Sequence, residues 1–274
     1  MTPNDLFSLK GKIALVTGGA TGIGRMATTG LMQAGAHVLI ASRKADACKA
    51  VADELNQMGT PGSVEGFAGD VGTEEGVAAL TKAVQERTDT LHILMNNAGI
   101  SWGAPMGQFP FDAWQKVMNV NNAGMFSLTQ SLLPMLIASS NADDPARVVN
   151  VGSVMGDAPL GDGAYSYAAS KAAVHQITRI MAKELASQHV TVNALAPGPF
   201  VSRMTAFATA DEDTRAKVGD DVPLGRVGRE EDIAGCMQFL CGRGGSYITG
   251  AILPVSGGIQ VMSGPNLFRA ALEG

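Results

Sequence analysis

Short apolar runs alternate along this chain with longer stretches of helical pattern, and this alternation limits the folds that are open to it. Strands and helices that follow one another in this way make right-handed crossovers and therefore a parallel sheet. The apolar runs are mostly continuous, as expected for strands buried on both faces. They are KIALVT (12–17), HVLIAS (37–42), SVEGFA (63–68), HILMNN (92–97), RVVNVG (147–152), VTVNAL (190–195) and AILPV (251–255). Helical patterns lie near residues 24–34, 44–58, 74–87, 112–138, 164–187 and 230–241.

The pattern predicts an α/β protein with a single Rossmann-type domain, in which a doubly wound parallel sheet of about seven strands is flanked by helices. We expect this domain to span residues 1–274, because no Pro/Ser-rich linker and no internal repeat interrupts the chain. Residues 1–9 are interpreted as an N-terminal arm and 262–274 as a C-terminal tail. The region 198–228, rich in Gly, Pro and Asp, is the longest poorly patterned stretch. Long loops beyond strand ends are usually functional, so we expect a substrate loop there.

Charge and composition argue against several kinds of partner. A net charge of −5 disfavours nucleic acid or an anionic membrane as the main partner. No apolar run reaches membrane-spanning length, and the first residues, MTPNDLFSLKGK, lack the apolar core of a secretory signal. Three cysteines without metal-ligand spacing and four dispersed histidines predict no metal site. We therefore expect a cytoplasmic protein with reduced thiols and a small-molecule substrate.

The glycine-rich segment TGGATGIG (17–24) follows the first predicted strand and leads into a helix. Glycines at this point allow a tight turn and the close approach of a pyrophosphate, while the helix N-terminus supplies free N–H groups. Other candidate residues follow later strands, at the edge where ligands bind in such sheets. They are Asp70, the segment NNAG (96–99), Ser153 and the pair Pro197–Gly198. This convergence favours a dinucleotide site.

The segment YSYAASK (165–171) places Tyr167 and Lys171 four residues apart, on one face of a predicted helix. An ammonium beside a phenol favours the phenolate, so we expect the pKa of Tyr167 to be lowered toward neutral pH. Tyr165 has only Ala169 at that spacing. On the spacing alone, a tyrosine and a lysine in this arrangement are usually a packed ring and a solvated amine.

Together, TGGATGIG, NNAG, a serine shortly before YxxxK, and NALAPG resemble the short-chain dehydrogenase/reductase family, and the resemblance runs from about residue 10 to 261. It implies that Tyr167 is the catalytic acid or base, Lys171 its partner and Ser153 the group that orients the substrate oxygen. Asn121, at the end of WQKVMNVN, resembles the asparagine that holds a water in the proton relay. The resemblance also implies a set of cofactor-binding residues. These are Gly18, Thr21, Gly22, Ile23, Gly24, Ser42, Arg43, Asp70, Val71, Asn97, Ala98, Gly99, Tyr167, Lys171, Pro197, Gly198, Phe200 and Ser202.

The end of the second strand bears on which nicotinamide cofactor is used. A carboxylate there pairs with a ribose 2′-hydroxyl and repels a 2′-phosphate. Ser42 stands where family members that use NAD usually have Asp, and Arg43 can form charge-assisted contacts to phosphate. The sequence therefore favours NADP(H), with NAD(H) possible. The alternative for Arg43 is a solvated residue that begins a helix and binds no phosphate. Arg25 could either bind phosphate or lie on the helix surface.

The substrate is less constrained. Several large apolar residues in the expected loops favour a ketone or 3-oxo group on a hydrophobic body over a sugar. The candidates are Trp102, Met155, Leu160, Tyr165, Met204 and Phe207, each of which could equally serve packing. The alternatives are an NAD(P)-dependent alcohol or hydroxysteroid dehydrogenase working toward oxidation, and a non-catalytic dinucleotide-binding relative. The apolar helices 122–138 and 164–187 resemble the dimer-forming pair of the family, so we expect a homotetramer, with a dimer as the alternative.

Overall fold

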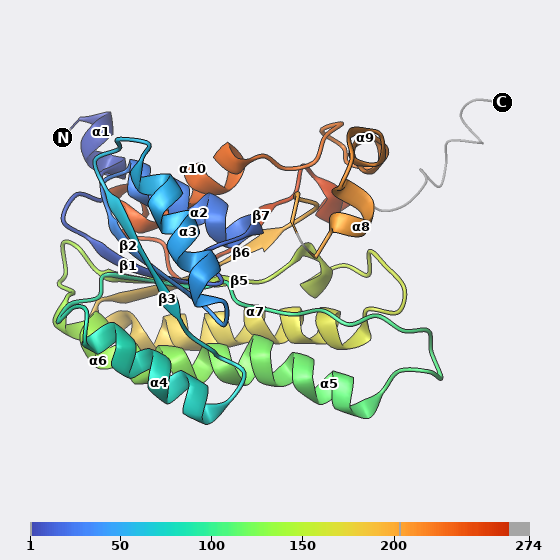
Figure 1. The fold of residues 1–274 in the computed structure, drawn as a ribbon, viewed down its shortest axis with the longest axis horizontal. Helices are drawn as coiled ribbons and strands as arrows, with labels where there is room; N and C mark the ends of the chain where they lie inside the picture. Colours follow the sequence, from blue (N-terminus) through green and yellow to red (C-terminus); the bar gives the residue numbers. More distant parts are fainter. Residues whose placement is uncertain (1, 203, 263–274) are drawn as a thin grey trace.

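The computed structural model describes residues 2–202 and 204–262, without the side chains of Pro3, Phe207 and Ala208 (Figure 1). At its centre lies one sheet of seven strands in the order β3-β2-β1-β4-β5-β6-β7, and every neighbouring pair is parallel. The prediction of a seven-stranded parallel sheet is thus confirmed. The strands are β1 (Ile13–Thr17), β2 (His37–Ser42), β3 (Ser63–Ala68), β4 (Ile93–Asn96), β5 (Ala146–Val151), β6 (Val190–Pro197) and β7 (Ile252–Val255).

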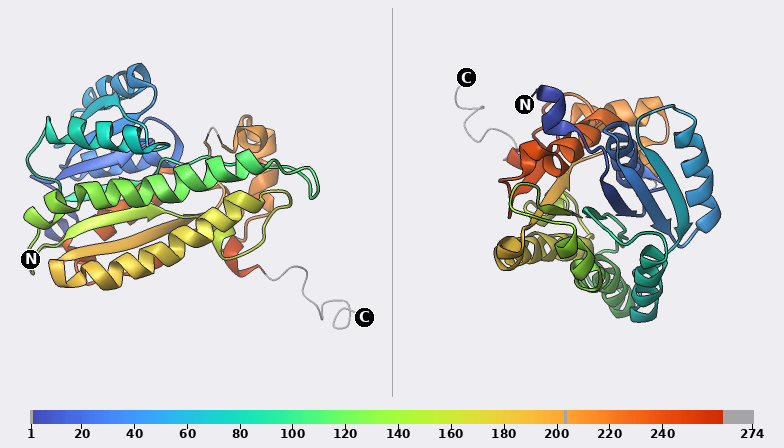
Figure 2. Two further views of the ribbon diagram at one scale, coloured as in Figure 1. Left: turned by 90° about the horizontal axis from the view of Figure 1, so that it is seen from below. Right: turned by 90° about the vertical axis from the view of Figure 1, so that its left-hand side faces the viewer.

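Helices cover both faces of the sheet, as the two views of Figure 2 show. One face packs against α2 (Gly22–Gln33), α3 (Ala45–Asn56) and α10 (Glu230–Cys241). The other packs against α4 (Glu74–Gln85), α6 (Met125–Ala138) and α7 (Tyr165–Leu185). Neighbouring residues of β1 divide between these two cores: Val16 lies in the first and Leu15 in the second. This double burial explains why the strands read as continuous apolar runs.

The predicted helical stretch 112–138 is divided in the structure. It consists of α5 (Phe111–Met118), a wider π-helical turn over Asn119–Gly124, and α6. At the end of the wide turn, a Cβ atom on Gly124 would lie 1.8 Å from the carbonyl oxygen of Val71. The backbone of the turn therefore packs directly on the loop after β3. Such turns are often found at functional sites.

Three short helices lie outside the predicted pattern: α1 (Pro3–Phe7), α8 (Ala206–Thr209) and α9 (Glu212–Asp220). Helix α9 is capped by Asp211, whose carboxylate accepts a hydrogen bond from the backbone N–H of Thr214 at 2.9 Å. The region 198–228 is thus partly helical. Of the predicted tail 262–274, only Met262 lies within the described residues. Across the described part of the chain, no helix combines the length and apolar character needed to span a bilayer.

Candidate active site

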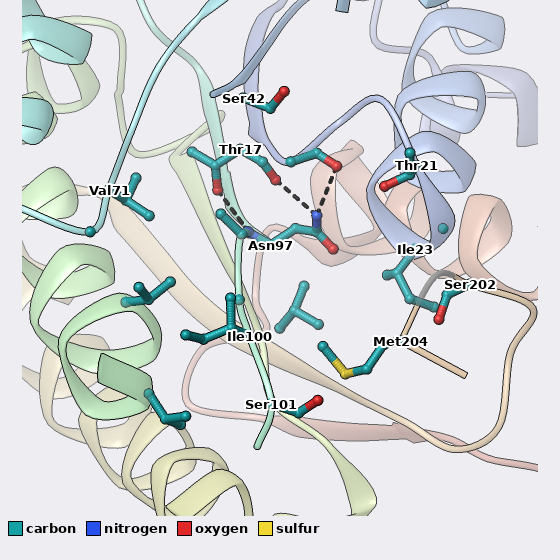
Figure 3. Close-up of a pocket in the computed structure, with 18 of the residues that line it drawn as sticks. Thr17, Thr21, Ile23, Ser42, Val71, Asn97, Ile100, Ser101, Ser202 and Met204 are labelled. Atoms are coloured by element: carbon teal, nitrogen blue, oxygen red, sulfur yellow. Dashed lines mark hydrogen bonds between the residues drawn. The ribbon is translucent and has the colours of Figure 1, made fainter. Parts of the chain in front are cut away.

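A cavity of about 1200 Å³ opens at the carboxyl ends of the central strands. Strands β1 and β4 lie side by side there, and the connections from them lead to opposite ends of the sheet. In open α/β sheets this switch in strand order creates the crevice in which ligands bind. Seventeen of the eighteen predicted cofactor residues line the cavity; the exception is Gly24. The structure therefore gathers in one place groups that are far apart in the sequence (Figure 3).

The glycine turn after β1 is tied to the end of β4. The side-chain amide of Asn97 donates to the carbonyl oxygens of Thr17 at 2.8 Å and Gly18 at 3.2 Å (Figure 3). In return, the hydroxyl of Thr17 accepts the backbone N–H groups of Asn97 and Ala98. The turn also requires glycine at position 24, because a Cβ atom there would lie 2.4 Å from the carbonyl oxygen of Gly18. These bonds fix the turn in front of the N-terminus of α2, which favours anions.

Two cations lie at the end of β2. Arg43 and Lys44 are exposed, line the cavity, and form no ion pair with a carboxylate of the described residues. The hydroxyl of Ser42 accepts the backbone N–H of Lys44 at 3.2 Å, which shapes the bend that presents both side chains. Lys44 was not among the predicted site residues, although its position beside Arg43 was a signal for it. Arg25 is ion-paired with Glu54 at 2.6 Å and does not line the cavity, so it serves the helix surface.

The loop after β3 forms another wall of the cavity. The carboxylate of Asp70 accepts the backbone N–H of Gly72 at 2.9 Å, and Val71 beside it is buried against the π-helical turn. Both residues line the cavity.

Ser153, Tyr167 and Lys171 meet where β5 ends and α7 begins. Ser153 precedes a short 3₁₀ turn (Val154–Gly156), and its hydroxyl accepts the backbone N–H of Met155 at 3.2 Å. The amine nitrogen of Lys171 lies 5.6 Å from the centre of the Tyr167 ring and donates to the carbonyl oxygen of Val151 at 2.7 Å. Three of the four predicted catalytic groups, Ser153, Tyr167 and Lys171, thus line the cavity.

The expected lowering of the pKa of Tyr167 toward neutral pH is wrong, because the phenol is buried. Burial raises the pKa of the Tyr167 phenol, and a hydrogen bond with the Ser153 side chain offsets only part of this rise. Burial also lowers the pKa of the Lys171 amine to about 8. Helical spacing reports that two residues share a face, but not how deeply the face is buried. The phenol of Tyr167 is therefore protonated at neutral pH, as a proton donor must be.

Asn121 lies in the π-helical turn and does not line the cavity. Its side-chain amide nitrogen donates to the carbonyl oxygen of Ile100 and to the hydroxyl of Ser170, and its oxygen accepts the N–H of Ile100, each at 2.9 Å. The side chain therefore joins the loop after β4 to α7, next to Lys171.

The predicted substrate residues separate into two groups. Trp102 and Met204 line the cavity and are partly exposed, whereas Met155, Leu160 and Tyr165 lie outside its lining. Tyr165 packs edge-to-face on Phe109, with ring centres 5.9 Å apart, which agrees with a packing role. The side chain of Phe207 lies outside the described part of the structure. Within the residues that are described, no cluster of three potential metal ligands occurs.

Comparison with known proteins agrees with this geometry. The model of the short chain dehydrogenase family matches residues 12–213. The rhamnolipids biosynthesis 3-oxoacyl-[acyl-carrier-protein] reductase of Pseudomonas aeruginosa is 44% identical over 255 residues, which cover 93% of this chain and 98% of that protein. This confirms the similarity to that reductase suggested by the segments NNAGISWGAP (96–105), PARVVNVGS (145–153) and SRMT (202–205).

Solved structures extend the comparison. The NADP active-site complex of RhlG from Pseudomonas aeruginosa superposes with a TM-score of 0.88 at 44% identity and covers 95% of this chain and 100% of that chain. A gluconate 5-dehydrogenase from Burkholderia cenocepacia, solved with NADP and tartrate, has a TM-score of 0.85 at 29% identity and the same coverage.

Proposed function

The chain belongs to the short-chain dehydrogenase family and is an oxidoreductase, and from this premise we propose that it reduces a ketone or 3-oxo group on a hydrophobic substrate with NADPH. The observation that carries the proposal is the meeting of Ser153, a protonated Tyr167 and Lys171 in one cavity that is also lined by Arg43 and Lys44, two cations without an ion pair among the described residues.

The cavity fits a dinucleotide with a 2′-phosphate. Gly22 has a φ of +52°, and a Cβ atom on it would lie 2.9 Å from the Ser202 side chain, so only hydrogen leaves the turn open at this point. Arg43 and Lys44 supply positive charge at the end of β2, where NAD-binding relatives usually carry a carboxylate. The relatives solved with NADP support the same cofactor.

We assign the proton transfer to Tyr167 and the orientation of the carbonyl oxygen to Ser153. The nicotinamide supplies the hydride when bound. Tyr167 donates its phenolic proton to the oxygen, and the Ser153 hydroxyl donates a hydrogen bond to the negative charge that develops there. Lys171, close to the phenol, stabilises the tyrosinate that the transfer leaves. The side-chain amide of Asn121 is already hydrogen-bonded to Ile100 and Ser170. A water of the proton relay at this residue would therefore be bound by the backbone of the π-helical turn.

The hydrophobic substrate is supported by the cavity wall and by one relative. Trp102 and Met204 present apolar surface at the cavity, and the 44% identical relative is a 3-oxoacyl reductase. The gluconate 5-dehydrogenase among the solved relatives marks the competing substrate class, a polar keto acid.

A substrate panel tests the proposal. Medium-chain 3-oxoacyl thioesters, bulky ketones, 5-ketogluconate and the matching alcohols are supplied with NADPH or NADP⁺, and with NADH or NAD⁺, while nicotinamide absorbance is followed. We expect the highest kcat/KM for apolar 3-oxo or ketone substrates with NADPH. Preference for 5-ketogluconate would overturn the substrate class, and no turnover of any carbonyl or alcohol would overturn the enzymatic proposal.

We further propose a homotetramer in the cytoplasm. Helices α6 and α7 lie side by side on one face (Figure 2), and they expose the apolar side chains of Phe126 and Ile180. Tyr247, near β7, is fully exposed and provides apolar surface for a second contact. All three cysteines are free thiols, which suits a reducing compartment.

A further inference from the structure

His175 is a buried titratable residue to which the proposed chemistry gives no part. It lies on α7 one turn after Lys171, and its side chain is only 2% exposed. Its ring packs against the turn that carries Ser153, between the two glycines of that turn. A Cβ atom on Gly152 would lie 2.2 Å from Nε2 of His175, and one on Gly156 would lie 2.8 Å from Cε1. The imidazole therefore occupies the space that side chains on both sides of Ser153 would need.

Asp157 completes this contact from the end of the same turn. Its carboxylate oxygen lies 3.1 Å from Nδ1 of His175, and about half of the carboxylate side chain is exposed. Because a carboxylate only accepts hydrogen bonds, Nδ1 carries the proton. The Nε2 atom is buried and has no hydrogen-bond partner among the described residues. A second proton there would be an unpaired donor facing Gly152, so the neutral imidazole is the form that fits.

We propose that His175 and Asp157 form a clamp that holds the turn of residues 152–157 on helix α7 and so sets the position of the Ser153 hydroxyl relative to Tyr167. His175 is a positioning residue and touches neither substrate nor cofactor. The clamp joins the two elements that supply the catalytic groups, because Ser153 lies on the turn while Tyr167 and Lys171 lie on the helix. This inference rests on the proposed function of those three residues.

The charges around His175 give the clamp a defined pH dependence. Burial lowers the pKa of His175, the Asp157 carboxylate acts in the opposite direction, and Arg179 and Lys171 on the same helix lower the pKa further. These are the charged groups that act on the ring within the described structure. Lowering the pH through this pKa adds the second proton and loosens the clamp. The kcat of the wild-type protein should therefore fall at acid pH.

Replacement of Asp157 tests the clamp, because a half-exposed side chain can be changed without emptying the core. Asp157→Ala removes the acceptor, and we expect kcat to fall about tenfold, as for a misplaced catalytic group, with NADPH affinity unchanged. Asp157→Asn keeps an acceptor for Nδ1–H and should restore most of the rate. Asp162→Ala is the matched control, since Asp162 is exposed in the same loop and its carboxylate forms no hydrogen bond or ion pair with the described residues. Equal kcat values in Asp157→Ala and wild type would overturn the proposal.

The pH profile separates positioning from a merely structural role. Asp157→Asn removes a charge that raises the pKa of His175, so the acid limb of kcat should move to lower pH. His175→Asn keeps a donor near Nδ1 but has no titrating ring, so this limb should disappear. If the acid limb of kcat were the same in all variants, protonation of His175 would not be its cause, and this part of the proposal would be refuted.

A measurement without substrate distinguishes failure of the clamp from failure of the proposed function. Hydrogen exchange of peptides covering 152–158 should be faster in Asp157→Ala than in wild type, while exchange in β6 is unchanged. Absence of turnover in the wild-type protein would refute the reductase, and the exchange rates would still decide whether the pair holds the turn. Unchanged exchange would overturn the clamp itself.

Discussion

The amine nitrogen of Lys171 lies 2.7 Å from the carbonyl oxygen of Val151, the last residue of strand β5. This bond crosses from helix α7 to the strand whose next residues carry Ser153. The amine is buried, and burial lowers its pKa to about 8. A positive charge is thus kept inside the protein at a cost in stability.

The first prediction concerns this cost. Because the folded state binds the Lys171 proton more weakly than the unfolded chain does, the penalty is fully present below pH 8 and is relieved as the pH rises toward 10. Lys171→Met carries no such proton. The free energy of unfolding of wild type relative to this variant should therefore rise by on the order of 2 kcal/mol between pH 7 and pH 10. Urea denaturation at fixed protein concentration measures it, with Lys183→Met, exposed on the same helix, as control. A difference that does not change with pH would refute the burial of a charged amine.

The second prediction concerns the two tyrosines of YSYAASK. Tyr167→Phe removes only the phenolic hydroxyl and should lower kcat by about 10²–10⁴-fold while NADPH still binds. Tyr165→Phe keeps the ring that packs on Phe109 and should keep most of the activity. Steady-state kinetics and NADPH fluorescence titrations measure both effects. If the two variants behaved the other way round, the assignment of Tyr167 would be wrong.

The third prediction concerns Ser153. Ser153→Ala should cost roughly 2–4 kcal/mol of transition-state stabilisation, the scale of a lost oxyanion donor. It should also raise the pKa of Tyr167 further, because the Ser153 hydrogen bond acts to lower it. In the oxidative direction Tyr167 must be deprotonated to act as the base, so the acid limb of the pH profile of kcat/KM should then move to higher pH. Near wild-type activity would remove Ser153 from the mechanism.

The fourth prediction concerns cofactor choice. If Arg43 binds a 2′-phosphate, Arg43→Ala should weaken NADPH about tenfold to hundredfold and NADH far less. Ser42→Asp should move the preference toward NADH, since a carboxylate repels the phosphate and accepts from a free 2′-hydroxyl. High salt should reduce the NADPH preference, because Arg43 is exposed. The measurement is kcat/KM with NADPH and with NADH for the wild-type protein, Arg43→Ala and Ser42→Asp.

Two outcomes would contradict this assignment. Equal losses for both cofactors in Arg43→Ala would mean that this arginine supports the loop. Wild-type preference for NADH would overturn the choice of NADP(H). Lys44→Ala is the companion variant, since its amine lines the same part of the cavity.

The fifth prediction concerns assembly. Static light scattering should give about four times the 28.2 kDa of one chain. Phe126→Glu would place a charge on the exposed apolar surface of α6 and should lower this mass. A mass near that of one chain at all working concentrations would refute the assembly.

Most of the fold could be predicted because the inner strands, such as β4, β5 and β6, are buried on both faces and therefore read as continuous apolar runs. The glycine turn and the groups at the strand ends could be predicted for a related reason, since a parallel sheet brings its carboxyl ends together. Three features depended on contacts that local sequence does not show. The π-helical turn packs on Val71, the pKa of Tyr167 depends on burial, and Arg25 is paired with Glu54, which lies 29 residues away.

With the strand order β3-β2-β1-β4-β5-β6-β7, different parts of the site come from different parts of the chain. The walls around the glycine turn, Ser42–Lys44 and Asp70 come from the first three strands, whereas Ser153, Tyr167 and Lys171 follow much later. The residues proposed to choose the cofactor and those proposed to carry out the carbonyl chemistry are thus encoded in separate stretches of the gene. Libraries that vary residues 42–44 and libraries that vary the loops after β4 and β6 can therefore be built independently and combined by a single crossover in the segment between them.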